Sequence, residues 1–215
     1  MSETKSAVRL DIFIDLVCPW CHVGKANLDR ALADHPEHPF VIQWHPFQLN
    51  PEMVAGGVDK RAYLADRFGK DRVVAMHEQL REVARKSGVE LDPDRPGRLP
   101  TTLDAHRLIH WAGLEGLQTA VVARLFQAYW DEGLDIGDHK VLADIGADVG
   151  MNRAAVLRLL QTDADADDLR ARDQDARHKG VTSVPTFLIA QHYVVSGAQP
   201  PEFWGEVIKE LMEQK

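Results

Sequence analysis

Cysteine, long apolar runs and blocks of positive charge are all scarce in this chain. Only two of its 215 residues are cysteine, so the fold does not depend on a framework of disulfide bonds. No apolar run approaches the roughly 18 residues that a membrane-spanning helix needs. The 25 basic residues are spread among 33 acidic ones, for a net charge of −8. The sequence therefore predicts a globular protein with neither a membrane nor a nucleic acid as its partner.

The first residues, Met1 to Ser6, contain neither the apolar stretch nor the cleavage-site pattern of a secretory signal peptide. We therefore expect a soluble, cytoplasmic protein. Stable disulfides are uncommon in the reducing cytoplasm, so a cysteine pair there is more typical of catalysis or redox sensing. The length of the chain suits one domain, with room for an insertion.

Both cysteines lie in one short motif, Cys18-Pro19-Trp20-Cys21, which follows the apolar segment Val8 to Ile14. Proline is favoured at the first position of a helix, so the motif predicts a helix start with Cys18 at its N-terminus. The unpaired N–H groups and the positive dipole end of a helix favour a thiolate there. We expect Cys18 to be the exposed nucleophile and Cys21, one turn further on, to be the more buried cysteine that resolves a mixed disulfide.

Two other interpretations of the motif concern bound groups. With His22 it also spells C-x-x-C-H, the attachment motif of c-type haem. Haem attachment needs export, and no axial ligand stands out among the five methionines. A structural zinc site needs four ligands, and the pair His106 and His110 has no third ligand nearby in the sequence. We therefore expect neither a metal nor a bound cofactor.

The chain begins with a predicted strand-helix-strand unit. Val8 to Ile14 is typical of a buried strand, a helix extends from Cys18 to about Ala33, and Phe40 to His45 is a second strand. Such a unit favours parallel pairing with a right-handed crossover. The cysteine motif then lies at the carboxyl end of the first strand, where sites in α/β sheets are usually found.

The rest of the chain is helical first and mixed at its end. From about Lys60 to Lys179 the apolar spacing predicts five or six helices, with Asp138 and Asn152 as N-caps. A hairpin follows, with strands at Thr186 to Ala190 and Tyr193 to Ser196. A last helix begins at Pro200-Pro201. The predicted fold is α/β, in the order β-α-β, a large helical block, then β-β-α.

Val184-Pro185 lies just before the first strand of this hairpin. By itself it is a weak signal, because only about one X–Pro bond in twenty is cis in folded proteins. Together with the cysteine motif, however, the arrangement resembles the thioredoxin superfamily. The helical insertion resembles its DsbA branch, and further segments are similar to the FrnE-like proteins related to 2-hydroxychromene-2-carboxylate isomerase. The matching segments are Asp15-Leu16-Val17-Cys18-Pro19-Trp20-Cys21, Pro46-Phe47-Gln48-Leu49-Asn50-Pro51, Asp104-Ala105-His106-Arg107-Leu108 and Val195-Ser196-Gly197-Ala198-Gln199-Pro200.

The resemblance implies a thioredoxin-like domain made of residues 1–58 and 180–215, with an all-helical insertion at 59–179. It implies that Cys18 is the nucleophile, that Cys21 resolves, and that the bond before Pro185 is cis. The Val184 backbone would then lie beside the Cys18 sulfur and pair with an extended substrate. Pro19, Trp20 and His22 are expected to tune the thiols, although a solvent-facing His22 is an equal alternative.

The implied function is that of a thiol-disulfide oxidoreductase acting on a thiol- or disulfide-bearing protein or small molecule, with glutathione as one redox partner it could use. A second hypothesis is glutathione-dependent isomerase or transferase chemistry on small aromatic substrates. The related isomerases and kappa-class transferases resemble one another in using a hydroxyl where this chain has Cys18. Aromatic residues could line such a pocket or pack in the core: Trp20, Trp44, Phe47 and Trp111. A third hypothesis is a redox-switched binding module.

Overall fold

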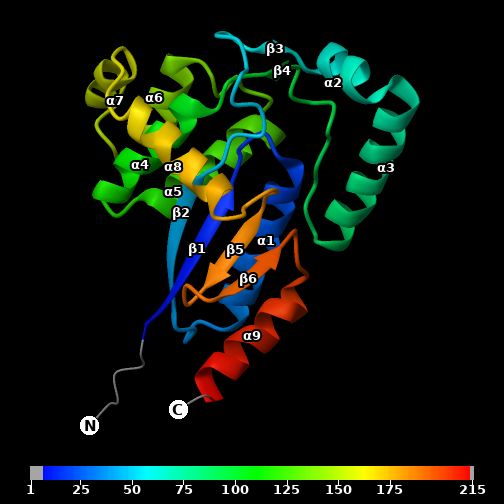
Figure 1. Ribbon diagram of the computed structural model, residues 1–215, viewed down its shortest axis with the longest axis vertical. Coiled ribbons are helices and arrows are strands. Elements are labelled where there is room, and N and C mark those ends of the chain that lie inside the picture. Colours follow the sequence, from blue (N-terminus) through cyan, green and yellow to red (C-terminus); the bar gives the residue numbers. More distant parts are fainter. Residues whose placement is uncertain (1–6, 214–215) are drawn as a thin grey trace.

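The computed structural model describes residues 7–213 and begins with the predicted strand-helix-strand unit (Figure 1). It consists of β1 (Val8–Ile14), α1 (Pro19–Asp34) and β2 (Phe40–Pro46). The two strands are parallel and pair from Val8 with Phe40 to Ile14 with Pro46. β1 lies in the middle of the sheet, and this explains why its side chains at Leu10 and Ile12 are fully buried. The predicted strands, helix and parallel pairing are confirmed.

The predicted hairpin completes a four-stranded sheet in the order β2-β1-β5-β6. β5 (Thr186–Ile189) is antiparallel both to β1 and to β6 (Tyr193–Ser196). β5 ends one residue earlier than expected because Ala190 and Gln191 both adopt positive φ angles. Two such residues form the tight turn whose twist suits an antiparallel hairpin.

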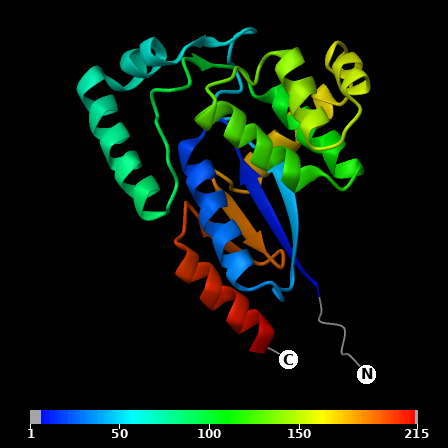
Figure 2. The ribbon, with the colours of Figure 1, turned by 180° about the vertical axis from the view of Figure 1, so that it is seen from behind.

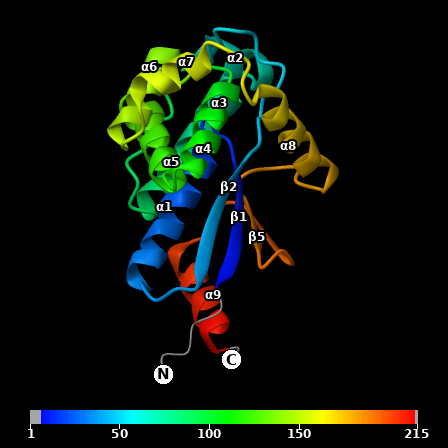
Figure 3. The ribbon, with the colours of Figure 1, turned by 90° about the vertical axis from the view of Figure 1, so that its left-hand side faces the viewer.

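Helices cover both faces of this sheet. Figure 2 shows α1 beside the last helix, α9 (Pro201–Glu213), on one face. Trp204 of α9 is fully buried, and its ring meets the edge of Phe187 in β5 at 4.7 Å between centroids. Seen from the side in Figure 3, α8 (Ala166–His178) lies beyond the opposite face. The sheet and the site at its end are therefore enclosed by helices.

The region between β2 and β5 is helical, as expected, but the expected number of five or six helices is wrong. Seven α-helices and a π-helical segment, η1, occur there. Gly69, with a φ of 83°, separates the first two of these helices. Besides α8 they are α2 (Lys60–Phe68), α3 (Lys70–Lys86), α4 (Leu103–Leu114), α5 (Gln118–Phe126), η1 (Gln127–Asp131), α6 (His139–Asp148) and α7 (Arg153–Leu160).

The two predicted N-caps are confirmed. The Asp138 side chain accepts hydrogen bonds from the first turn of α6, and the Asn152 side chain does so for α7. A short second sheet joins β3 (Val58–Asp59) to β4 (Arg98–Leu99). The domain boundaries at 58/59 and 179/180 stay a prediction, and the first of them falls inside β3. Within residues 7–213, no helix is long and apolar enough to cross a membrane.

Candidate active site

The cysteine motif begins α1 in the predicted way. Cys18 is the N-cap, in extended conformation with φ −85° and ψ 114°, and Pro19 begins the helix. The backbone N–H groups of Cys21 and His22 donate to the Cys18 carbonyl oxygen, at 3.1 and 3.3 Å. The Cys18 side chain makes no capping hydrogen bond, and its sulfur lies at the positive end of the helix.

Both cysteines are free thiols, and both are buried. Cys18 is 3% exposed and Cys21 0%, so the expectation of an exposed Cys18 is wrong. The helical region closes over this end of β1: Trp130 of η1 donates from Nε1 to the carbonyl oxygen of Leu16, at 3.0 Å. Burial, followed by the hydrogen bond and charge of Cys18, raises the pKa of Cys21 well above its usual value. Cys21 is therefore a protonated thiol at neutral pH.

The loop before β5 faces the first cysteine. The bond between Val184 and Pro185 is cis. The Cys18 sulfur lies 3.6 Å from the Val184 carbonyl oxygen and donates to it. Gly24 of α1, which the sequence did not single out, permits this approach, since a Cβ there would lie 3.0 Å from Cγ of Pro185. Glycine within a predicted helix was the available signal for such close packing.

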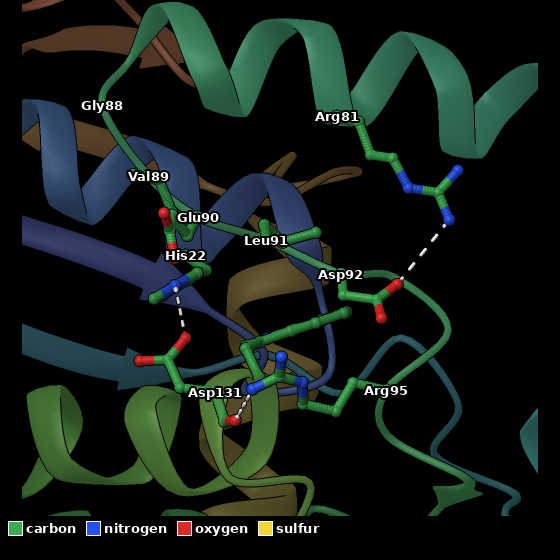
Figure 4. Close-up of a pocket in the computed structure, with 10 residues that line it drawn as sticks. His22, Arg81, Gly88, Val89, Glu90, Leu91, Asp92, Arg95 and Asp131 are labelled. Carbon is green, nitrogen blue, oxygen red and sulfur yellow. Dashed lines mark hydrogen bonds and ion pairs between the residues drawn. The ribbon is translucent and has the colours of Figure 1, made fainter.

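His22 is neither solvent-facing nor positively charged. Its side chain is 14% exposed. The centroid of its ring lies 5.4 Å from the ring centroid of Phe126 and 6.5 Å from that of Trp130. Burial, with a smaller contribution from the charge of Lys25, lowers the pKa of His22 to about 4. The imidazole is therefore neutral at pH 7 and does not stabilise a thiolate by charge. Its Nε2 lies 4.0 Å from Oδ1 of Asp131 (Figure 4).

A cavity of about 700 Å³ opens beside His22. Figure 4 shows the segment from Gly88 to Asp92 along one side of it, with Asp131 opposite. Arg95 donates to the Asp131 carbonyl oxygen, and Arg81 lies 3.6 Å from the Asp92 carboxylate. The cavity therefore has charges of both signs near one end of the cysteine motif.

A buried acid and a buried imidazole lie behind the second cysteine, and sequence analysis did not predict that they meet. Asp15 follows β1 and is 1% exposed, and His106 of α4 is 2% exposed. Oδ1 of Asp15 lies 3.9 Å from Nε2 of His106, and neither atom has a hydrogen-bond partner among residues 7–213. Burial raises the pKa of Asp15 to about 6 and lowers that of His106 to about 3. Both residues belong to segments that carry the family resemblance, but no local pattern brings them together.

The other aromatic candidates are core residues. Trp44, Phe47 and Trp111 are at most 5% exposed, and the partly buried Trp20 packs against the same core. Among residues 7–213, no group of three or more histidine, cysteine or acidic side chains is placed to hold a metal ion.

Comparisons with known proteins show the family and the fold. A family model described as the DSBA-like thioredoxin domain matches residues 9–209. The probable DsbA oxidoreductase SCO1869 from Streptomyces coelicolor is 27% identical, with a TM-score of 0.85 over 97% of this chain and 91% of that one.

Two further structures are less similar in sequence. A 2-hydroxychromene-2-carboxylate isomerase has 16% identity and a TM-score of 0.72, over 96% of this chain and 97% of its own. The cytosolic disulfide reductase DsbM from Pseudomonas aeruginosa, solved with glutathione, has 20% identity and a TM-score of 0.66, over 95% and 98%. At these identities the likeness shows the thioredoxin-like fold alone.

Proposed function

Because this chain belongs to the family of DsbA-like thioredoxin domains, we propose that it is a thiol-disulfide oxidoreductase whose redox pair is Cys18 and Cys21. One observation carries the proposal. Two free thiols share the first turn of α1, and the sulfur of the N-cap cysteine lies 3.6 Å from the carbonyl oxygen of Val184. Membership of the family confirms the resemblance expected from the sequence.

The reaction proceeds by two exchanges. The Cys18 thiolate attacks one sulfur of a substrate disulfide, whose S–S bond breaks, and the leaving thiolate takes the electron pair and a proton from solvent. Cys21 then loses its proton and attacks the Cys18 sulfur of the mixed disulfide. The second substrate thiolate leaves, and a Cys18–Cys21 disulfide remains. The substrate is reduced by two electrons and the protein is oxidised by two; the reverse steps oxidise a substrate dithiol.

The two cysteines suit these roles because their surroundings differ. The amino end of α1 favours negative charge on the Cys18 sulfur. Cys21 is fully buried, and burial raises its pKa, so it stays protonated until the mixed disulfide has formed. The neutral His22 and Trp20 then act through packing and access to the sulfur, and Pro19 through the position of the helix start.

The substrate must reach a sulfur with little exposed surface. A Cys18 that is only 3% exposed suits a small disulfide or an extended segment better than a disulfide within a folded protein. An extended segment can pair with the main chain at Val184, as an added strand pairs with a sheet edge. The cavity beside His22, at about 700 Å³, has room for a small peptide such as glutathione. We propose that glutathione in the cytoplasm is a redox partner of the protein, and that the protein works without a bound cofactor.

A trapping experiment tests the proposal. The Cys21→Ala variant, mixed with oxidised glutathione, should accumulate a stable adduct on Cys18, measured by intact mass spectrometry. The Cys18→Ala variant is the matched control and should form none. Absence of the adduct, or an equal amount in the control, would contradict the proposed pair. Turnover of a small aromatic substrate that needs glutathione and survives loss of Cys21 would favour the isomerase or transferase hypothesis instead.

The direction of electron flow needs a separate measurement. Equilibration of the parent protein against a series of glutathione redox buffers gives the reduction potential of the pair. For this two-electron couple, about 30 mV corresponds to about 1.4 kcal/mol. A potential well below that of the buffer series would indicate a reductase, and one well above it an oxidase.

A further inference from the structure

The loop between β6 and α9, residues 197–200, is bonded to the segment that faces Cys18. The main-chain N–H of Gly197 donates to the carbonyl oxygen of Pro185, at 2.8 Å. Pro185 directly follows Val184, whose own carbonyl oxygen lies 3.6 Å from the Cys18 sulfur. A shift of this loop therefore also moves the carbonyl oxygen that faces the sulfur.

One buried side chain of α1 holds the same loop from the other side. Asn27 is 2% exposed, and its Nδ2 donates to the carbonyl oxygen of Gln199, at 2.9 Å. The Gln199 side chain in turn donates to the carbonyl oxygen of Ser196, at 2.8 Å, and closes the loop on itself. Asn27 and Pro185 are therefore joined through one short loop whose shape is fixed by hydrogen bonds.

The loop and the segment before β5 meet the same strip of α1. Gly24 lies three residues before Asn27, and positions three apart share one face of a helix. A Cβ at Gly24 would lie 3.4 Å from Cα of Ala198 in the loop and 3.0 Å from Cγ of Pro185. The helix that begins at the nucleophile therefore contacts both segments directly, and Asn27 supplies the hydrogen bond of this contact.

The surroundings of Asn27 favour a role in position over a role in stability. Its Oδ1 is buried and has no hydrogen-bond partner within the described part of the chain. A buried acceptor without a partner costs at least as much as one ordinary hydrogen bond gains. An apolar side chain of similar size would therefore stabilise the fold about as well, and what only the amide supplies is the bond to the loop.

The carbonyl oxygen of Val184 needs a new donor when Cys18 reacts. In the dithiol form the Cys18 thiol donates to it, and Val184 is only 8% exposed. Once Cys18 is a thiolate or part of a mixed disulfide, it has no S–H to donate. A main-chain N–H of an extended substrate can take this place, provided that the carbonyl oxygen is held in position.

We propose that Asn27 is a positioning residue for substrates that carry their disulfide on an extended polypeptide segment. Its amide fixes the loop of residues 197–200, and this loop fixes the main chain of Val184 with which the segment pairs. The inference rests on the proposed function, in which Cys18 attacks the substrate disulfide. A small disulfide that has no main chain to pair does not depend on Asn27.

Two probes with the same coloured leaving group separate recognition from chemistry. Dithiodipyridine is the small probe, and a short alanine peptide whose one cysteine is a thiopyridyl mixed disulfide is the extended one. The Cys18 thiolate attacks the peptide sulfur and a Cys18–peptide disulfide forms. The old S–S bond breaks, and thiopyridone leaves with the electron pair. The ratio of the two rate constants, measured by stopped flow, reports what the peptide main chain contributes.

In Asn27→Leu we expect the rate constant with the peptide at pH 7 to fall by about fivefold or more, because the pairing carbonyl is no longer held. The rate constant with dithiodipyridine should stay within about twofold of that of the parent. An unchanged ratio, or an equal fall with both probes, would overturn the inference and leave the proposed function intact. A parent protein that releases no thiopyridone from either probe would contradict the proposed function itself.

Gln118→Leu is the matched control. The Gln118 side-chain amide also donates to a main-chain carbonyl oxygen, that of Trp44 at 3.2 Å, but it does so at the opposite edge of the sheet. Both rate constants should be those of the parent. A ratio that falls in Gln118→Leu as it does in Asn27→Leu would overturn the assignment to Asn27.

A second measurement keeps Asn27 in place and covers the case in which its replacement prevents folding. In Cys21→Ala, the adducts of Cys18 with the peptide and with thiopyridine are both stable and are compared by NMR. We expect the side-chain amide hydrogens of Asn27 to exchange with solvent more slowly in the peptide adduct, because the paired segment holds Val184 and the loop. Equal exchange rates in the two adducts would overturn the inference.

Discussion

The two sides of the first turn of α1 differ more than their shared motif suggests. On the side of Cys18, the carbonyl oxygen of Val184 lies 3.6 Å from the sulfur. On the side of Cys21, the buried Asp15 carboxylate accepts a hydrogen bond from the main chain of Leu49, and its other oxygen faces Nε2 of the buried His106 at 3.9 Å. The sulfur of Cys18 therefore has a main-chain partner, whereas Cys21 is fully buried near the charge of Asp15.

The two histidines next to the motif show the same difference. His22 packs against the ring of Phe126 beside the cavity, and Nε2 of His106 faces the Asp15 carboxylate at 3.9 Å. Burial lowers the pKa of both, to about 4 and about 3. Both are neutral at pH 7, so the difference in their roles comes from what each ring faces. Four predictions test this contrast.

Loss of the nucleophile should have the largest effect. Dithiodipyridine releases one coloured thiopyridone when Cys18 attacks it, the first phase, and another when Cys21 resolves the adduct, the second phase. In Cys18→Ser both phases should slow by at least about 10³-fold at pH 7, because a hydroxyl at this pH does not replace a thiolate. Cys21→Ser should keep the first phase and stop after one equivalent. A full first phase in Cys18→Ser would mean that Cys21 is the attacking thiol and would reverse the assigned roles of the two sides.

The His106→Gln variant should lose less stability in acid than the parent protein does. The folded pKa of His106, about 3, lies below the unfolded value of 6.5, so as the pH falls the unfolded state binds a proton that the native state does not. The free energy of unfolding of the parent protein therefore falls by about 3 kcal/mol, through this group, when the pH falls from 7 to 4. Urea unfolding at the two pH values measures it. A variant with the parent's full acid sensitivity would show that His106 is protonated in the folded protein.

The Asp15→Asn substitution should change the pH dependence of the free energy of unfolding in the direction opposite to that of His106→Gln. The folded pKa of Asp15 is raised to about 6 from 3.8, so as the pH falls the native state binds a proton before the unfolded state does. The stabilisation that this proton gives the native state is lost as the pH rises through 6. The parent should gain about 2 kcal/mol from this group between pH 7 and pH 4, and the variant should not. Urea unfolding of the parent and the variant at pH 7 and pH 4 measures this gain. A parent that gains no more stability than the variant on acidification would contradict the raised pKa of Asp15.

The smallest effect is expected from His22→Gln. Since the imidazole is neutral above a pKa of about 4, its charge does not change between pH 6 and pH 8. The rate of the first phase should therefore change by less than about threefold, with the same pH profile as the parent. A profile that loses an inflection between pH 6 and pH 8 would show a charged His22 and would contradict the contrast with His106.

Much of the fold was predictable because its signals are local. Pro19 marks the start of α1, the apolar segment Val8–Ile14 forms β1, and the turn after Ile189 separates two short strands. Each of these depends on the preferences of neighbouring residues. The predicted number of helices was wrong, and at Gly69 a single residue with positive φ ends one helix and begins the next.

By itself, the sequence determined the motif: two cysteines one turn apart, a proline that begins their helix, and a second proline before a later strand. These are properties of neighbouring residues, so they can be identified without knowledge of the packing. Only the tertiary structure decided how deeply Cys18 is buried, what His22 faces, and that Asp15 meets His106. Burial and pKa depend on atoms brought together from distant segments, so no local pattern in the chain encodes them.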